Sequence, residues 1–221
     1  MEKWSDIISA RSTTFSWTDE LIPKEVIQEV CEEVHLFCPS KNRKIPYIVN
    51  VIRNTDYDQR KALHTGCHRN TDRNIDEDGG NPQVLAPTLL VFSKRDVTEA
   101  ETKFQTQEKR VEDGIANTDN IEIGMAALSF LYGLTSRGWD TGLCQCVRSR
   151  SGTARLLGTN GSTDLIIGVG RRNTVDSETG ETTTWPKYLD PRNDKHRKIP
   201  YPYGISPYPK PTFEDIYKIE F

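Results

Sequence analysis

An arginine followed by three hydroxyl side chains lies near the start of the chain, in Arg11, Ser12, Thr13 and Thr14. A guanidinium group and neighbouring hydroxyl groups match the oxygens of a phosphate, because the guanidinium presents several N–H donors in one plane. A solvated turn before a helix is the commoner structure for such a segment taken alone. The residue types nevertheless indicate a candidate phosphate site that uses Arg11, Ser12 and Thr13.

A second polar segment lies between two prolines, Pro39 and Pro46. The residues Ser40, Lys41 and Asn42, followed by another cation, suit an anionic ligand or one that accepts and donates several hydrogen bonds. Proline at both ends predicts a loop, since proline disfavours helix and removes a backbone donor. We therefore treat residues 39–46 as a second candidate binding segment.

A third basic group occurs late in the chain, and it comprises Arg192, Lys195, Arg197 and Lys198. A solvated loop is the simplest interpretation of such a cluster. If the cluster meets Arg11 in the folded protein, Arg197 and Lys198 would complete the phosphate site.

Cysteine and histidine spacings raise the question of a metal site, and the relevant pairs are Cys31 with His35, His64 with Cys67 and His68, and Cys144 with Cys146. None of these spacings matches the paired CxxC pattern of a structural zinc clip. Buried thiols and histidines are the commoner case, so we expect no metal. We also expect Cys144 and Cys146 to be free thiols, because one intervening residue seldom allows disulfide geometry.

The elements that must position these residues are organised around residues 121–134, where apolar side chains cover every side of a helical wheel. Such a helix belongs in a core or an interface. It should end at Arg137 and Gly138, a cation followed by a residue that tolerates positive φ. We expect further helices over residues 4–10, 23–37, 98–110 and 151–157, and strands over residues 47–52, 84–92, 164–169 and 213–221.

Composition bounds the remaining possibilities. A chain of 221 residues with 35% hydrophobic residues predicts one domain over residues 1–221, with a long polar loop over 66–81 and an irregular, extended tail over 171–212. The net charge of −3 gives no global basic field, so no nucleic-acid partner is expected. No signal peptide or membrane anchor is expected either, and five scattered cysteines indicate free thiols. We expect a cytoplasmic protein.

Taken together, four segments resemble the FMN-dependent nitroreductase family, in the family's order and over most of the chain. The opening helix and its Arg11-Ser12 pair resemble the family's phosphate-binding start, and Pro39 to Tyr47 resembles its PSxxNxQPW segment. The NPQVLAP sequence from Asn81 to Pro87 resembles the family segment that precedes a core strand. The apolar helix, its turn and the later LLG and IGVG sequences resemble the family's flavin-facing helix and last core strand.

The resemblance implies an α+β fold in which helices wrap a mostly antiparallel sheet, an intertwined homodimer, and one FMN at each subunit interface. It also implies an NAD(P)H oxidoreductase that passes hydride through flavin N5 to a small-molecule acceptor such as a nitroaromatic or a quinone. The flavin carries the electron chemistry, so no catalytic side chain is expected. The implied FMN-binding residues are Arg11, Ser12, Thr13, Pro39, Ser40, Lys41, Asn42, Asn81, Gln145, Cys146, Arg197 and Lys198.

The chain also departs from the family pattern. Asn42 lies one position early in the second segment, and Ile45 replaces the family's glutamine. Gln145 and Cys146 occupy the positions near flavin N5 where an acidic residue and glycine are commoner in the family. A non-catalytic flavin-binding or interaction protein on the same fold is therefore the alternative, and a structural assembly protein is a third possibility.

Overall fold

The structure is a computed structural model, and it describes residues 4–11, 13–40, 45–56, 58, 60–61, 64, 82–95, 112–145, 150–159 and 162–174. The predicted loop over 66–81, the helix over 98–110, the strand over 213–221 and all but the first residues of the predicted tail lie outside these ranges. The division of the chain into one domain over residues 1–221 stays a prediction.

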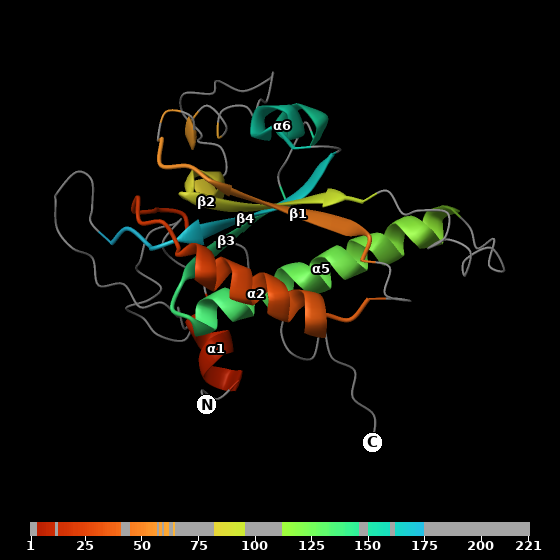
Figure 1. Cartoon of the computed structure of the whole chain (residues 1–221), viewed down its shortest axis with the longest axis horizontal. Coiled ribbons are helices and arrows are strands. Elements are labelled where there is room, and N and C mark those ends of the chain that lie inside the picture. Colours follow the sequence, from red (N-terminus) through yellow and green to blue (C-terminus); the bar gives the residue numbers. More distant parts are fainter. Residues whose placement is uncertain are drawn as a thin grey trace, which may run out of the picture.

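A four-stranded antiparallel sheet forms the centre of the described fold (Figure 1). Its strands are β1 (Tyr47–Arg53), β2 (Thr88–Lys94), β3 (Asp140–Cys144) and β4 (Thr163–Gly170), in the order β1-β2-β4-β3. Each neighbouring pair is antiparallel, with Phe92 opposite Leu165 at the centre. The predicted α+β class with a mostly antiparallel sheet is confirmed.

Helices cover both faces of this sheet (Figure 1). On one face lie α1 (Trp4–Ala10), α2 (Lys24–Phe37) and α5 (Glu112–Ser136). On the other lie α6 (Arg150–Leu157) and the short 3-10 helix η2 (Pro82–Leu85). Two buried apolar clusters result, one between the sheet and α2 with α5, the other between the sheet and η2.

The long helix α5 packs in the core, as its sequence predicts. Ile123, Ala126, Phe130 and Leu134 are buried in the main core, where apolar burial stabilises the fold. The helix ends at Ser136, and Gly138 follows with φ +78°, as predicted for a residue that must adopt a left-handed conformation. None of the helices in the described ranges is long and apolar enough to cross a membrane.

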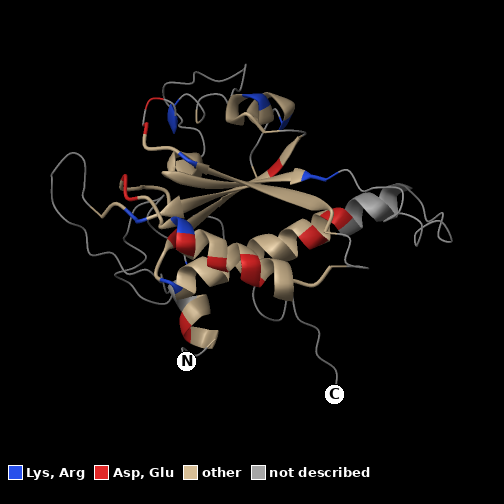
Figure 2. Cartoon of the chain, in the orientation of Figure 1, with Lys and Arg blue, Asp and Glu red and all other residues tan. Residues whose placement is uncertain are grey.

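Helix α2 packs against α5 through Ile27, Val30 and Val34. Phe37 of the same helix is 78% exposed. The residue is the last of the helix, where the chain turns away toward Pro39. Acidic side chains lie along α2 and α5, whereas the strands carry few charges (Figure 2).

One strand prediction needs correction, and one strand was not predicted. The strand expected over residues 84–92 begins at Thr88, because residues 82–85 form η2 and Pro87 has no N–H to donate to the ladder. Strand β3 was not predicted at all. Its sequence, DTGLC, has little β propensity, and pairing with β4 on one side and with Thr13 on the other determines its conformation.

Candidate functional site

The segment after α1 is joined to the edge strand β3. Thr13 forms a parallel bridge with Thr141, and the N–H of Thr14 donates to the carbonyl oxygen of Thr141 at 2.9 Å. Farther along, the N–H of Thr18 donates to the carbonyl oxygen of Arg171 at 2.9 Å. These backbone bonds fix residues 13–18 beside the start of β3 and the end of β4.

Arg11 lies two residues before this bridge and is half-buried. Its N–H donates to the carbonyl oxygen of Ile7 at 3.1 Å, which continues the hydrogen bonding of α1. Within the part of the chain that the structure describes, its guanidinium forms no ion pair and no hydrogen bond. A partly buried cation without a protein partner is a candidate ligand for an anion.

The opposite end of β3 leads directly into Gln145, which is exposed. Gln145 is four positions after Thr141, so at about 3.3 Å per residue the two residues lie roughly 13 Å apart along the strand. Arg11 therefore lies near the start of this edge strand, and an exposed polar residue follows its end. An elongated ligand with an anionic group at one end fits such a spacing.

The Trp17 side chain packs against the part of the sheet where β3 pairs with β4. Its indole N–H donates to the carbonyl oxygen of Pro82 at 3.0 Å. The ring lies where β3 and β4 have glycine, and a Cβ at Gly142 or at Gly168 would be 3.1 Å from Trp17 Cζ2. Glycine is required at these two positions because a Cβ at Gly142 would be 2.6 Å from the backbone carbonyl oxygen of Thr14, and a Cβ at Gly168 would be closer still to that of Gln83.

The turn before β3 is held by a stacked cation. The Arg171 guanidinium carbon lies 4.0 Å from the centroid of the Trp139 ring, and the same side chain donates to the carbonyl oxygen of Gly138. Arg171 also donates to Glu20 at 3.4 Å. A cation over an indole face contributes about 0.5–2 kcal/mol. These contacts fix where β3 begins and hence where Thr141 meets Thr13.

Ser40 is held in place by a hydrogen bond to α5. Its hydroxyl donates to Glu122 Oε2 at 2.6 Å and accepts from the N–H of Ile45 at 2.8 Å. Glu122 is only 3% exposed, and burial of a carboxylate is costly unless it is hydrogen-bonded. The bond from Ser40 meets part of that requirement and ties the start of the 40–45 segment to its end.

Ile45 has a backbone conformation that is uncommon for a β-branched residue, with φ +44°. Its N–H donates to Ser40, and its carbonyl oxygen accepts from Arg95 Nε at 2.9 Å. The N–H of Arg95 also donates to the carbonyl oxygen of Pro46 at 3.0 Å. Strain of this kind persists where the surrounding structure fixes it, and it is commonest at ligand-binding sites.

Tyr47 and Cys38 lie close to the same carboxylate. Burial, together with the neighbouring Cys38 and Glu122, raises the pKa of Tyr47 to about 12. Burial also raises the pKa of the Cys38 thiol, and Glu122 adds to the effect. Both groups therefore stay protonated at neutral pH, and Cys38 is not an activated nucleophile. Among the described cysteines, Cys31, Cys38 and Cys144 form no disulfide. Cys146 lies outside the described residues, so the prediction that Cys144 and Cys146 are free thiols stays a prediction.

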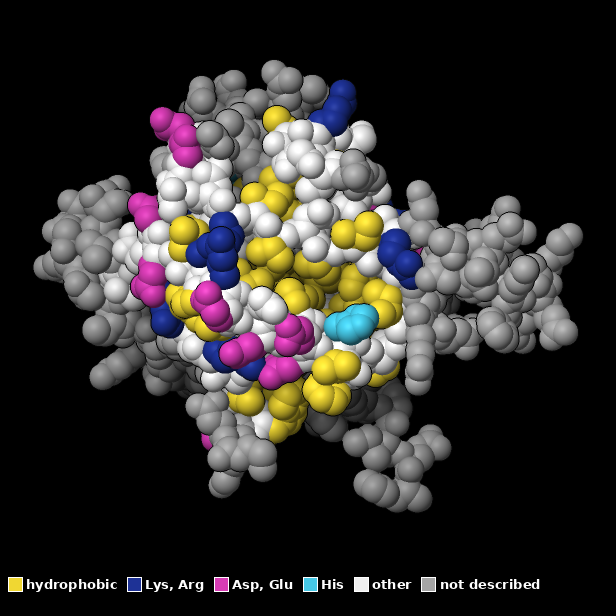
Figure 3. Space-filling view, viewed as in Figure 1, with side chains coloured by type: hydrophobic (Ala, Val, Ile, Leu, Met, Phe, Trp, Pro, Cys, Tyr) yellow, Lys and Arg dark blue, Asp and Glu magenta, His cyan; other side chains and the backbone are white. Residues whose placement is uncertain are grey.

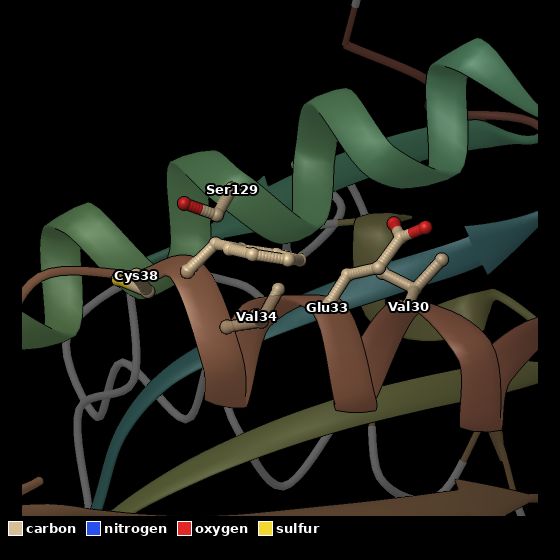
Figure 4. A pocket seen from close by; sticks show the side chains of 6 residues that line it. Val30, Glu33, Val34, Cys38 and Ser129 are labelled. Carbon is tan, nitrogen blue, oxygen red and sulfur yellow. The ribbon is translucent and has the colours of Figure 1, made fainter.

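A groove of about 260 Å³ lies between α2 and α5. Figure 4 shows Val30, Glu33, Val34 and Cys38 reaching it from the α2 side and Ser129 from α5. The lining is largely apolar, and Phe37 completes it.

Large exposed hydrophobic side chains are also found at Leu36, Ile121 and Leu128. Figure 3 shows hydrophobic side chains gathered on the face that presents β1 and α2.

The structure groups the predicted site residues that it describes in three places. Arg11 and Thr13 lie together at the start of β3, and Gln145 lies after its end. Pro39 and Ser40 lie where Ser40 meets Glu122, about 21 Å along α5 from its C-terminal end at 1.5 Å per residue. The predicted residues Ser12, Lys41, Asn42, Asn81, Cys146, Arg197 and Lys198 lie outside the described residues.

Sequence reasoning missed the residues that position these groups, Glu122 and Arg95 foremost. Glu122 had a detectable signal, because it is an acidic residue inside the otherwise apolar NIEIGM sequence. Charged residues are rarely buried unless they have a partner. Among the described residues, no three His, Cys, Asp or Glu side chains gather to hold a metal ion.

Comparison with known proteins identifies the fold. No protein-family model matches the chain, and no curated protein matches its sequence. Solved structures do match it. A nitroreductase family protein from Streptococcus pneumoniae is similar with a TM-score of 0.59 and 17% identity, over 83% of this chain and 96% of its own.

Two further structures have printed descriptions that name their ligands. An FMN-dependent nitroreductase from Mycobacterium smegmatis in complex with NADPH has a TM-score of 0.54 and 14% identity, over 76% of this chain and 87% of its own. An NADPH:FMN oxidoreductase from Vibrio harveyi complexed with NAD⁺ has a TM-score of 0.59 and 16% identity, over 96% of this chain and 80% of its own. The chain therefore has the nitroreductase fold, and the predicted resemblance is confirmed at that level.

Proposed function

We propose that this protein is an FMN-dependent NAD(P)H oxidoreductase on the nitroreductase fold. The proposal has two supports. Solved structures with this fold are described as FMN-dependent nitroreductases and NAD(P)H:FMN oxidoreductases. The two kinds of group that such a cofactor requires also lie near the two ends of the edge strand β3, at a suitable separation.

The observation that best supports the proposal is the distance between the two ends of β3. FMN has its phosphate at one end of an extended chain and its ring at the other. Arg11 and Thr13 would bind the phosphate near the start of β3, with Ser12, Arg197 and Lys198 as further proposed phosphate ligands. Gln145 and Cys146 would present backbone to the ring at the end of β3. The absence of a protein partner for Arg11 among the described residues fits this role, since a bound phosphate would neutralise the cation.

The bound flavin would supply hydride transfer from NADH or NADPH to a small acceptor, such as a nitroaromatic or a quinone. The residues of the chain would hold the ring in place, shield it from water and leave one face open. The buried network of Ser40 and Glu122 would fix the Pro39-to-Pro46 segment against the ring, with Lys41, Asn42 and Asn81 as proposed polar neighbours.

We also propose a homodimer with one FMN at each subunit interface, as the resemblance implies. Phe37 and Leu128 expose apolar surface on α2 and α5, and apolar surface of this kind is typical of obligate interfaces. An interface site would let Pro39 and Ser40 of one protomer serve a flavin held by its partner. A cytoplasmic location remains a prediction.

A flavin-binding or interaction protein without turnover is the second candidate, and the departures at Ile45 and Gln145 favour it. Purified protein that is yellow and releases FMN on denaturation would support both candidates. Anaerobic stopped-flow absorbance then separates them. We expect loss of the flavin absorbance on mixing with NADH or NADPH and its return on adding a quinone. Colourless protein that does not bind added FMN would contradict both candidates.

A further inference from the structure

Arg53, the last residue of β1, has no acidic partner among the described residues. Its side chain is partly buried and forms one hydrogen bond there, from Nη2 to the carbonyl oxygen of Ile22 at 2.9 Å. The guanidinium has several other N–H donors, and Nε is buried without an acceptor. Because a partly buried charge is costly unless it is paired or hydrogen-bonded, Arg53 favours an acceptor that carries negative charge.

The acidic side chains nearest to Ile22 in the sequence do not neutralise Arg53. Asp19 and Glu20 each pair with another arginine. Glu25, in the first turn of α2, is exposed and pairs with no cation in the ranges that the structure describes. The positive charge of Arg53 is therefore not compensated by the segment that its guanidinium contacts.

Thr88 lies directly opposite Arg53 in the ladder between β1 and β2. Its side chain faces α2 and α5, as those of Leu90 and Phe92 do, because alternate residues of a strand share a face. Thr88 is 0% exposed, and its hydroxyl has no hydrogen-bond partner within the described structure. Two neighbouring side chains that can donate hydrogen bonds thus lack acceptors at this corner of the sheet.

The N-terminus of α2 adds further donors at the same corner. The helix begins at Lys24, two residues after Ile22, and its N-cap Pro23 makes no side-chain cap hydrogen bond. The first N–H groups of a helix have no acceptor within the helix and lie at the positive end of its dipole. The bond from Arg53 to Ile22 brings the guanidinium close to this helix end. Phosphate-type anions commonly bind at such ends.

We propose that an inorganic oxyanion of the phosphate or sulfate type binds at this corner, between the Arg53 guanidinium and the first turn of α2. Such an anion supplies both the acceptors and the negative charge that the corner lacks, whereas water supplies acceptors alone. The site is separate from that of Arg11. Strands β1 and β3 are the two edges of the described sheet, roughly 14 Å apart at about 4.8 Å per strand. The inference is independent of the proposed FMN function.

Sulfate titration of the full-length protein, followed by the chemical shifts of backbone amides, tests the proposal. The titration uses the Arg11→Ala background, so that the other candidate anion site does not contribute. We expect the amides of Lys24, Glu25 and Val26 to shift in a saturable way with sulfate, and to shift little with chloride at equal ionic strength. Adding Arg53→Gln should raise the sulfate dissociation constant about tenfold, since a charge-assisted contact is lost.

Arg155→Gln is the matched control. Arg155 is an exposed arginine of α6 with no ion pair among the described residues, so its replacement changes the net charge equally and should leave sulfate binding at α2 unchanged. If Arg53→Gln does not fold, Arg53→Lys replaces it. Lysine keeps the charge without the planar fork, and we expect about a threefold weakening.

Three results would overturn the proposal. The first is the absence of a saturable shift at the start of α2, and the second is an unchanged sulfate affinity in the Arg53 variant. The third is an equal loss in the Arg155 variant, which would show that sulfate responds only to net charge. None of these results bears on FMN, because flavin binding is measured separately. A protein that binds sulfate at α2 and no flavin would overturn the proposed function alone.

Discussion

Trp17 lies against Gly168, so that a Cβ added to the glycine would be 3.1 Å from Trp17 Cζ2 and closer still to the carbonyl oxygen of Gln83. A backbone atom cannot move as a flexible side chain does. The two contacts mean that η2, Trp17 and β4 fit together only when position 168 has no side chain.

Gly168→Ala should therefore destabilise the protein. We expect a decrease of about 1–3 kcal/mol in the free energy of unfolding, the range found for overpacked cores. Chemical denaturation measures it. Gly124→Ala is the matched control, because a Cβ at Gly124 would meet nothing within 4 Å and the residue is exposed in α5. That change should stabilise by about 0.5–1 kcal/mol. Equal effects of the two changes would contradict this account of Gly168.

Arg11→Ala should weaken FMN binding without unfolding the protein. A charge-assisted hydrogen bond contributes about 1.5–3 kcal/mol, which corresponds to a roughly ten- to hundredfold higher dissociation constant. Riboflavin lacks the phosphate, so its affinity should hardly change. Equal weakening of both ligands, or unchanged FMN binding, would refute the phosphate assignment.

Leu128 and Leu131 should respond differently to a charge. Leu128 is 46% exposed on α5, whereas Leu131 is 6% exposed and packs in the core. Leu128→Glu should give folded, soluble monomer, because a charge disfavours an apolar interface. Leu131→Glu should give little soluble protein, since it buries an unpaired carboxylate. Sedimentation velocity measures the first outcome. A Leu128→Glu protein with the wild-type sedimentation coefficient would place the interface elsewhere, and a wild-type monomer would contradict the dimer.

Tyr47 should make stability depend on alkaline pH. In the unfolded chain a tyrosine loses its proton near its ordinary pKa of 10.0, whereas folded Tyr47 has a pKa of about 12. The stabilising contribution is thus fully present below pH 10 and is lost as pH rises to about 12. Tyr47→Phe should reduce this decrease in the free energy of unfolding, which denaturation at pH 9 and pH 11 can measure. An identical pH dependence in both proteins would show that Tyr47 titrates normally.

The main elements of the fold follow from local sequence. The all-round apolar residues 121–134, the end at Gly138 and the β-branched residues 47–52 each specify their own structure, and the structure confirms them. Strand β3 could not be predicted, because its conformation comes from partners, Thr13 and β4, that are distant in sequence. Short polar strands have no local signal when tertiary pairing determines them.

The candidate site likewise contains residues whose role the local sequence predicts and residues whose role it does not. The residue types alone indicated that Arg11 binds an anion, because a cation beside several hydroxyl groups suits a phosphate in any fold. The role of Ser40 could not be read in this way. Its hydroxyl has a partner 82 positions later in the sequence, and the single hydroxyl proton lies in that bond. A polar residue in a binding motif thus gives the chemistry available, and the three-dimensional neighbours decide whether it is free to act.

The order of the strands in the sheet has a consequence for how the molecule forms. The central strands β2 and β4 are neighbours in space, yet α5, β3 and α6 lie between them in the sequence. A large part of the chain must be made and brought back before Phe92 can pair with Leu165. Folding that depends on such distant contacts is slow, because the entropy of closing long loops is lost before the contacts form. During this delay the apolar strand β2 has no partner on its β4 side, so refolding yield should fall as protein concentration rises.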